Sequence, residues 1–215
     1  MKYREIIEKS VSASISLVFF LVAATFLNVA IAEEKGLIVR AGYAAVDPNS
    51  NSETVPGAGG EVAADSGNAL GLTVTYMLEE NWGVGLLAAS PFKHDIDHSV
   101  LGEVASTKHL PPTITLQYHF NTRDSGKPYV GIGMNYTKFF EEETSRPLEG
   151  VDLELDESFG LAMEAGVDWF IDEYWGASVQ IWWLDIDTDA SLDGGQEFEV
   201  RIDPLVYMFG LSYRL

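Results

Sequence analysis

The chain contains no cysteine among its 215 residues. Disulfide bonds are therefore excluded, and so is a lipid anchor attached through a cysteine thiol. Basic residues are scarce, because 13 lysines and arginines stand against 33 aspartates and glutamates, for a formal net charge of −20. Such acidity argues against nucleic-acid partners, whose phosphates require a basic surface. Residues 33–215 also lack an apolar run long enough to span a membrane as a helix.

The first 32 residues have the three parts of a secretory signal peptide. Basic residues lie among the first nine positions, residues 11–27 are mostly apolar, and Ala30-Ile31-Ala32 is a small-residue cleavage box. We predict cleavage after Ala32, which leaves residues 33–215 as one domain by length. A transmembrane anchor is the alternative interpretation, but the cleavage box and the lack of a basic stop-transfer flank favour the signal peptide.

The rest of the chain alternates between apolar and small or polar residues with a period of two. Successive side chains of a β-strand point to opposite faces, so this pattern predicts strands with one apolar face. Short turns and longer polar loops alternate between the segments, as periplasmic turns and extracellular loops do in outer-membrane proteins. The segments fall near residues 36–46, 69–78, 82–92, 110–120, 128–140, 157–170, 174–187 and 198–215.

The two faces of these segments differ in a way that indicates a membrane barrel. One row is large and apolar, as in Leu70, Leu72, Val74 and Tyr76, whereas the opposite rows are rich in glycine, threonine and serine. Only a closed barrel lets strands cross a bilayer without unpaired edges. We therefore predict an all-β fold, an eight-stranded antiparallel transmembrane β-barrel. A soluble sandwich or lipocalin-like barrel is the alternative.

The inward rows carry charged residues toward the predicted periplasmic end. Unpaired charges in a narrow lumen are costly, so cations and carboxylates there are expected to pair. We predict that they form a polar plug, which stops a continuous aqueous channel. Its members are Arg40, His119, Glu164, Asp168 and Arg214.

The outer halves of the same rows are apolar and predict a ligand-binding cavity in the upper lumen. An eight-stranded barrel has room for side chains or for one small ligand, so the alternative is that these residues only fill the barrel. The predicted cavity residues are Leu87, Ala89, Trp182, Leu184, Val206 and Met208.

Three prolines lie where the third strand ends and the fourth begins. Pro91, Pro111 and Pro112 donate no hydrogen bond to a strand ladder. In the outer half of a barrel wall they can interrupt pairing and leave a lateral opening toward the lipid. The alternative is that they only terminate strands.

Several strings, in their order and spacing, resemble the OmpW family of eight-stranded outer-membrane proteins over essentially the whole of residues 33–215. The resemblance implies a hydrophobic lumen closed on the periplasmic side, into which small apolar molecules pass from outside before leaving sideways into the membrane. The strings are Ser90-Pro91-Phe92-Lys93-His94-Asp95-Ile96, His109-Leu110-Pro111-Pro112-Thr113, Gln117-Tyr118-His119-Phe120, the run from Pro128 to Thr137, and Asp203-Pro204.

These observations predict a passive channel for small hydrophobic molecules in the outer membrane of a Gram-negative bacterium. The expected partners are membrane lipid, lipopolysaccharide, small apolar solutes and the barrel-assembly machinery, whose recognition signal the aromatic C-terminal strand resembles. The alternative is a surface barrel for envelope integrity, adhesion or stress tolerance, without transport. No nucleophile elbow or catalytic spacing indicates an enzyme, and no cofactor is expected.

Histidines and aspartates near one loop form the remaining candidate site. The cluster of His94, Asp95, Asp97, His98 and His109 has residue types that bind metal. Loop groups of this kind are usually solvated or hydrogen bonded, so we favour a structural role at the mouth of the cavity and expect no metal.

Overall fold

The computed structural model describes residues 36–57 and 59–215, and every regular element in that part of the chain is a β-strand. No helix among these residues is long and apolar enough to cross a membrane. The predicted signal peptide, residues 1–32, lies outside the described residues and stays a prediction.

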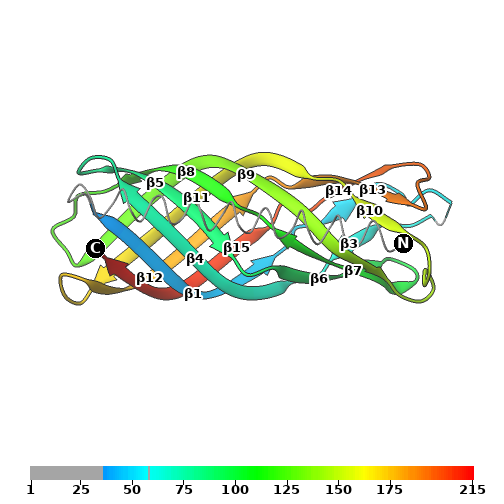
Figure 1. The fold of residues 1–215 in the computed structure, drawn as a ribbon, viewed down its shortest axis with the longest axis horizontal. Coiled ribbons are helices and arrows are strands. Elements are labelled where there is room, and N and C mark those ends of the chain that lie inside the picture. The colour runs from blue at the N-terminus through cyan, green and yellow to red at the C-terminus, as the bar shows by residue number, and fades with distance from the viewer. Residues whose placement is uncertain (1–35, 58) are drawn as a thin grey trace, which may run out of the picture.

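Eight long strands form one closed antiparallel barrel, as predicted (Figure 1). Each strand pairs with the next around the ring, and the last pairs back to the first. In ring order the strands are β1 (Leu37–Asp47), β4 (Gly67–Met77), β5 (Trp82–Ala89), β8 (Thr113–His119), β9 (Gly126–Thr144), β11 (Ser158–Phe170), β12 (Trp175–Leu184) and β15 (Leu205–Arg214).

The ladder between β1 and β15 closes the barrel. Its register runs from Ile38 opposite Arg214 to Asp47 opposite Leu205. The final strand, near the C-terminus, therefore has a partner on each side, β1 and β12. A bilayer offers no other hydrogen-bond partner for an open strand edge, so this ladder makes insertion of the sheet in lipid possible.

Side chains sort between the two faces of the wall as the alternation predicts. Leu70, Phe159 and Leu211 face outward and are 73%, 66% and 60% exposed. On β12, Trp182 is 0% exposed whereas its neighbour Ile181 is 38% exposed. The outward row thus forms the apolar surface that faces acyl chains, and the inward row fills the lumen.

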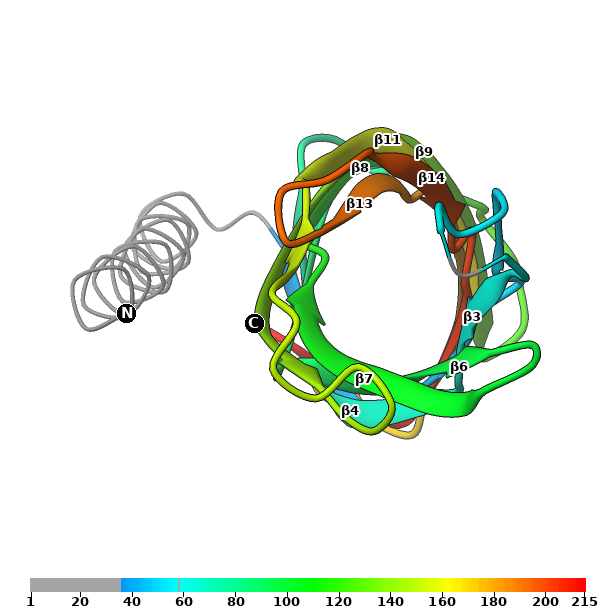
Figure 2. The ribbon, with the colours of Figure 1, turned by 90° about the vertical axis from the view of Figure 1, so that its right-hand side faces the viewer.

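Four segments were expected to be loops, but the structure forms β-strands in all of them. They are residues 47–68, 93–109, 141–156 and 188–197. Six further strands lie in them, and a seventh, at Phe198–Arg201, opens the segment predicted as the last strand; together they continue the wall past the barrel, and we call them the outer extension. Figure 2 looks down onto this end, opposite the C-terminus. The strands are β2 (Asn51–Ser52), β3 (Val62–Ala64), β6 (Phe92–His98), β7 (Gly102–Leu110), β10 (Leu153–Leu155), β13 (Asp187–Leu192) and β14 (Phe198–Arg201).

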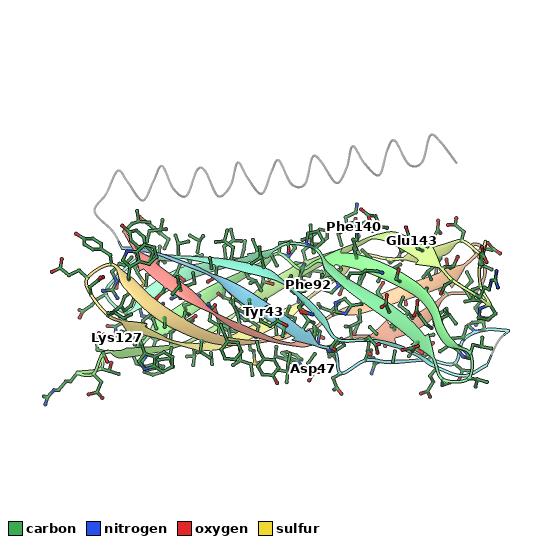
Figure 3. The ribbon with its side chains drawn as sticks, turned by 90° about the horizontal axis from the view of Figure 1, so that it is seen from below. Tyr43, Asp47, Phe92, Lys127, Phe140 and Glu143 are labelled. Carbon is green, nitrogen blue, oxygen red and sulfur yellow. The ribbon has the colours of Figure 1, made fainter. Side chains whose placement is uncertain are left out.

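Two sheets make up the outer extension. Strands β3, β6 and β7 continue from the far half of β9, whereas β10, β13, β14 and β2 form a separate four-stranded sheet. Figure 3 shows the reach of β9, from Lys127 near one end of the molecule to Phe140 and Glu143 toward the other. Serine hydroxyls join the two sheets, because Val62 N donates to Ser52 Oγ at 2.8 Å.

Glycines at the closing ladder allow its two strands to approach. A Cβ placed on Gly42 would lie 2.1 Å from the carbonyl oxygen of Phe209, far inside contact distance. Gly42 pairs with Gly210, whose own Cβ would lie 2.2 Å from the carbonyl oxygen of Ala41. Both strands therefore need glycine at this point of the seam.

We predict that Gly42→Ala destabilises the barrel by about 1–3 kcal/mol, because the added methyl group forces the backbone of β1 away from β15. Unfolding in urea from lipid vesicles, followed by the gel shift between folded and unfolded barrel, measures the change. Ala41→Val, which adds methyl groups on the exposed face, is the control. Equal stability of Gly42→Ala and the parent would contradict the tight seam.

Candidate functional site: a lumen with a polar and an apolar half

A buried ion pair crosses the periplasmic half of the lumen. Arg40 on β1 donates from Nε and Nη2 to the two carboxylate oxygens of Asp168 on β11, at 2.9 and 2.7 Å. Both residues are fully buried. Because β1 and β11 are not neighbours in the ring, the pair spans the lumen rather than running along the wall.

Hydrogen bonds extend the ion pair around the lumen. The Nη1 atom of Arg40 donates to Thr75 Oγ1 at 2.7 Å, and that hydroxyl donates to Gln117 Oε1 at 2.9 Å. Gln117 Nε2 in turn donates to Glu164 Oε1 at 2.8 Å, and Thr115 donates to the same oxygen. Four strands, β1, β4, β8 and β11, are thereby linked through their inward side chains.

Two aromatic rings complete this polar layer. The guanidinium carbon of Arg40 lies 4.7 Å from the centroid of the Tyr129 ring. The Tyr129 ring also stacks on the His119 ring, with the two centroids 4.9 Å apart. His119 Nε2 also lies 3.0 Å from Gln117 Oε1. Planar groups thus fill the space that the hydrogen bonds leave, and cation–π attraction holds the arginine in place.

Four of the five predicted plug residues meet in this layer, namely Arg40, His119, Glu164 and Asp168. Arg214 does not join them. Its guanidinium lies over the Phe170 ring, 3.9 Å from the centroid, and the side chain is only partly buried. Among the described residues Arg214 forms no salt bridge with Asp168 or Glu164, because its guanidinium lies over an aromatic ring near the rim, and its part in the plug stays a prediction.

The outer half of the lumen is apolar. Leu87, Trp182, Leu184, Val206 and Met208 are at most 4% exposed and belong to one hydrophobic cluster. Ala89 is partly buried and packs against it. The predicted cavity residues thus face inward and pack together, and their role in binding a ligand stays a prediction.

Sequence reasoning missed the upward continuation of this cluster into the outer extension. The same core includes buried residues at the outer ends of the predicted strands, such as Phe92, Phe139 and Ile186, and residues of predicted loops, Val55 and Ala190. The period-two alternation of Phe198, Val200 and Ile202, which opens the predicted segment 198–215, was the signal of this continuation. The members in this region are Val55, Phe92, Phe139, Ile186, Ala190, Phe198, Val200 and Ile202.

The wall is interrupted beside the apolar half. The ladder between β5 and β8 ends at Leu87 opposite Thr113, and the β6–β7 ladder starts at Phe92 opposite His109. In the interruption between these points, residues 88–90 pair instead with β4, and Leu110 and Pro112 pair with β9. All three predicted prolines lie in this interruption, and its use as an opening stays a prediction.

The histidines form an aromatic stack above the interruption. The rings of His94 and His109 stack with centroids 4.8 Å apart; Phe92 contacts both rings, and Phe139 contacts His109. His94 Nδ1 donates to the carbonyl oxygen of Asp65 at 2.5 Å, which ties β6 to the turn before β4. Burial lowers the pKa of His94, and burial and the His94 neighbour lower the pKa of His109 to about 3.

The carboxylates of the predicted metal cluster do not converge with these rings. Asp95 lies 3.4 Å from Lys93 in an exposed ion pair. Among the described residues, the acids whose oxygens lie within 4.8 Å of one another are Asp185, Asp187 and Asp203, at the base of the outer extension. Burial and the nearby Asp203 and Asp185 raise the pKa of Asp187, as expected for mutual repulsion.

Comparison with known proteins agrees with this architecture. The model of the OmpW family matches residues 33–215. Outer membrane protein W of Vibrio cholerae is 40% identical over 194 residues, which cover 85% of this chain and 89% of the relative. The chain belongs to the OmpW family. Its place is therefore the outer membrane of a Gram-negative bacterium, with the outer extension on the cell surface.

A solved structure and a further relative are also similar to this chain. The crystal structure of the outer membrane protein OprG from Pseudomonas aeruginosa superposes with a TM-score of 0.76 at 39% identity, covering 84% of this chain and 96% of that one. The dibenzothiophene metabolism operon protein PahQ of Pseudomonas aeruginosa is 29% identical over 165 residues, which cover 73% of this chain and 74% of PahQ.

We predict that Arg40→Met destabilises the barrel by about 3–5 kcal/mol, because it leaves the Asp168 carboxylate buried without its cation. The double variant Arg40→Met with Asp168→Leu should recover part of that loss. Urea unfolding from vesicles measures both. The control is Arg201→Met, which removes an exposed pair with Glu199 and should cost at most about 1 kcal/mol. Equal losses in Arg40→Met and Arg201→Met would contradict the account.

We predict that the β6–β7 hairpin loosens in acid. The folded pKa of His109 lies below the ordinary value of 6.5, so the unfolded hairpin binds a proton more readily than the folded one. Stability is then constant above about pH 7 and falls as the pH decreases from 6.5 toward 3. Amide hydrogen exchange in β6 and β7 measures the loss. His109→Phe should show a smaller loss, and an equally steep one would contradict the assignment.

Proposed function

We propose that the protein is a passive, non-enzymatic route for small hydrophobic molecules across the outer leaflet. Cargo enters the apolar lumen through the outer extension and leaves sideways into the membrane. The polar layer around Arg40 and Asp168 stops it from continuing to the periplasm. An apolar solute would have to displace hydrogen-bonded charges there, which costs several kcal/mol per charge.

One observation carries the proposal. Leu87 belongs to the apolar cluster of the lumen and also forms, with Thr113, the last pair of the ladder before the wall is interrupted. The apolar half of the lumen and the interruption therefore lie at the same height. Cargo that reaches Leu87 meets a break in backbone pairing beside it and a closed polar layer below.

The physical need for such a route is clear from the membrane itself. Lipopolysaccharide presents charged and sugar groups that apolar solutes cross poorly, and a water-filled pore would return those solutes to water. An apolar pocket with an exit into acyl chains lowers this barrier without an energy source. The name of PahQ, which refers to dibenzothiophene metabolism, is consistent with an apolar cargo.

Two partners follow from the same proposal. The outer extension is surrounded by lipopolysaccharide, since it continues the wall beyond the apolar belt. The barrel-assembly machinery is the second partner, because outward aromatic and apolar residues alternate along β15 up to Leu215, as in Phe209 and Leu211.

We predict that Leu87→Asp lowers uptake of an apolar dye by about tenfold or more, because a carboxylate in the lumen must be desolvated to admit the dye. The assay uses a deletion strain complemented with each variant, with barrel assembly checked by the gel shift. Val100→Asp is the matched control, since Val100 is 79% exposed in the β6–β7 turn. Dye entry that is equal in the deletion strain and its parent would favour the non-transporting surface barrel instead.

We predict that the double variant Pro111→Val and Pro112→Val slows uptake several-fold while the dye still binds. Valine at 111 restores a backbone N–H on the side of residues 88–90, and valine at 112 restores one toward β9, where Pro112 O already accepts from Tyr136 N; together they extend the regular ladder across the interruption. Dye binding to purified protein and uptake by cells separate the two effects. Pro56→Val, in the loop between β2 and β3, is the control. Uptake at the parental rate in the double variant would argue against the lateral exit.

A further inference from the structure

Buried polar atoms without a hydrogen-bond partner concentrate in the lumen. In a folded protein such atoms are rare, and each one needs an explanation. Among the described residues, eight side chains have one, and six of those eight side chains face the barrel lumen. The six are Thr73, Tyr129, Glu164, Gln180, Trp182 and Ser212.

Three of these groups lie together where the polar layer meets the apolar cluster. Glu164 on β11 and Trp182 on β12 are directly paired, so their inward side chains are neighbours. Gln180 is on the same face of β12, two residues closer to the periplasm. The unpartnered atoms are Glu164 Oε2, Gln180 Oε1 and Trp182 Nε1.

The other atoms of these side chains are occupied. Glu164 Oε1 accepts from Gln117 and Thr115, and Gln180 Nε2 donates to Ser178 Oγ at 3.3 Å and lies 3.8 Å from Met208 Sδ. The three free atoms therefore remain as one donor, the indole N–H, and two acceptor oxygens. All three residues are at most 5% exposed, so bulk water does not solvate the groups.

This set selects a particular chemical group. A hydroxyl can donate to the Glu164 or Gln180 oxygen and accept from the Trp182 N–H at once. An ammonium group cannot accept, and a ketone or ester carbonyl cannot donate, so each leaves part of the set unpartnered. A hydrocarbon leaves all of it unpartnered.

We propose that the lumen binds an apolar molecule with one terminal hydroxyl, which is seated against Trp182 Nε1 and Glu164 Oε2. This inference rests on the proposed function and names the class of its cargo. The apolar body then lies along Leu87, Leu184 and Val206, in the direction of the outer extension and the wall interruption. Trp182 sets the specificity, because it supplies the donor.

Competition between two matched compounds tests the inference. Purified protein in detergent binds an apolar fluorescent dye, which is displaced by 1-decanol or by decane. The measured quantity is the ratio of the two apparent affinities, and it is compared between variants, so that partition of each compound into micelles cancels. Trp182→Phe keeps an aromatic ring but removes the N–H. Trp183→Phe, the partly exposed neighbour in the outward row, is the matched control.

We expect the preference for decanol over decane to fall about three- to tenfold in Trp182→Phe relative to Trp183→Phe, as for loss of one hydrogen bond. Glu164→Met should lower the same ratio. If Glu164→Met fails to assemble, Trp182→Phe decides alone. An unchanged ratio of decanol to decane affinity in Trp182→Phe would overturn the inference. The proposed function would still stand in that case, provided that decane displaces the dye. If neither compound displaces the dye from the unmodified protein, the proposed function fails with it.

Discussion

Backbone hydrogen bonding in lipid is the constraint on which the rest of this structure depends. Acyl chains offer no partner for N–H or C=O groups, so every strand must pair on both sides. The β1–β15 ladder meets that need, with Gly42 and Gly210 allowing the close approach. Once the sheet is closed, alternate side chains face either lipid or lumen. Both the apolar belt and the contents of the lumen follow from that division.

The narrow lumen then sets what the protein can do. Its lower half carries a buried ion pair, which is stable only when hydrogen bonds satisfy the remaining atoms, and Thr75, Gln117 and Tyr129 surround it for this reason. Its upper half is apolar and continues into the outer extension. The break in pairing described above lies beside the upper half, at Leu87 and Thr113. Entry from outside and exit through the wall are consistent with this arrangement.

Much of the fold could be predicted from the sequence, because a period of two is a local property. It placed eight strands and put Trp182 and Leu184 inside with Ile181 outside. Most of the outer extension was missed because strands such as β3 and β10, of three residues each, show too little alternation to distinguish them from loop. Contacts across the lumen were also out of reach: that Arg40 meets Asp168 while Arg214 meets Phe170 depends on barrel stagger, which sequence does not display.

The most direct test of the central claim is to locate an apolar molecule inside the protein. Crystals soaked with a brominated alkane reveal each bromine by anomalous scattering. The account predicts bromine beside Leu87 and Trp182, or in the wall interruption between residues 88–91 and 110–112, above the layer of Arg40 and Asp168. Bromine on the periplasmic side of that layer, with the ion pair parted, would contradict it.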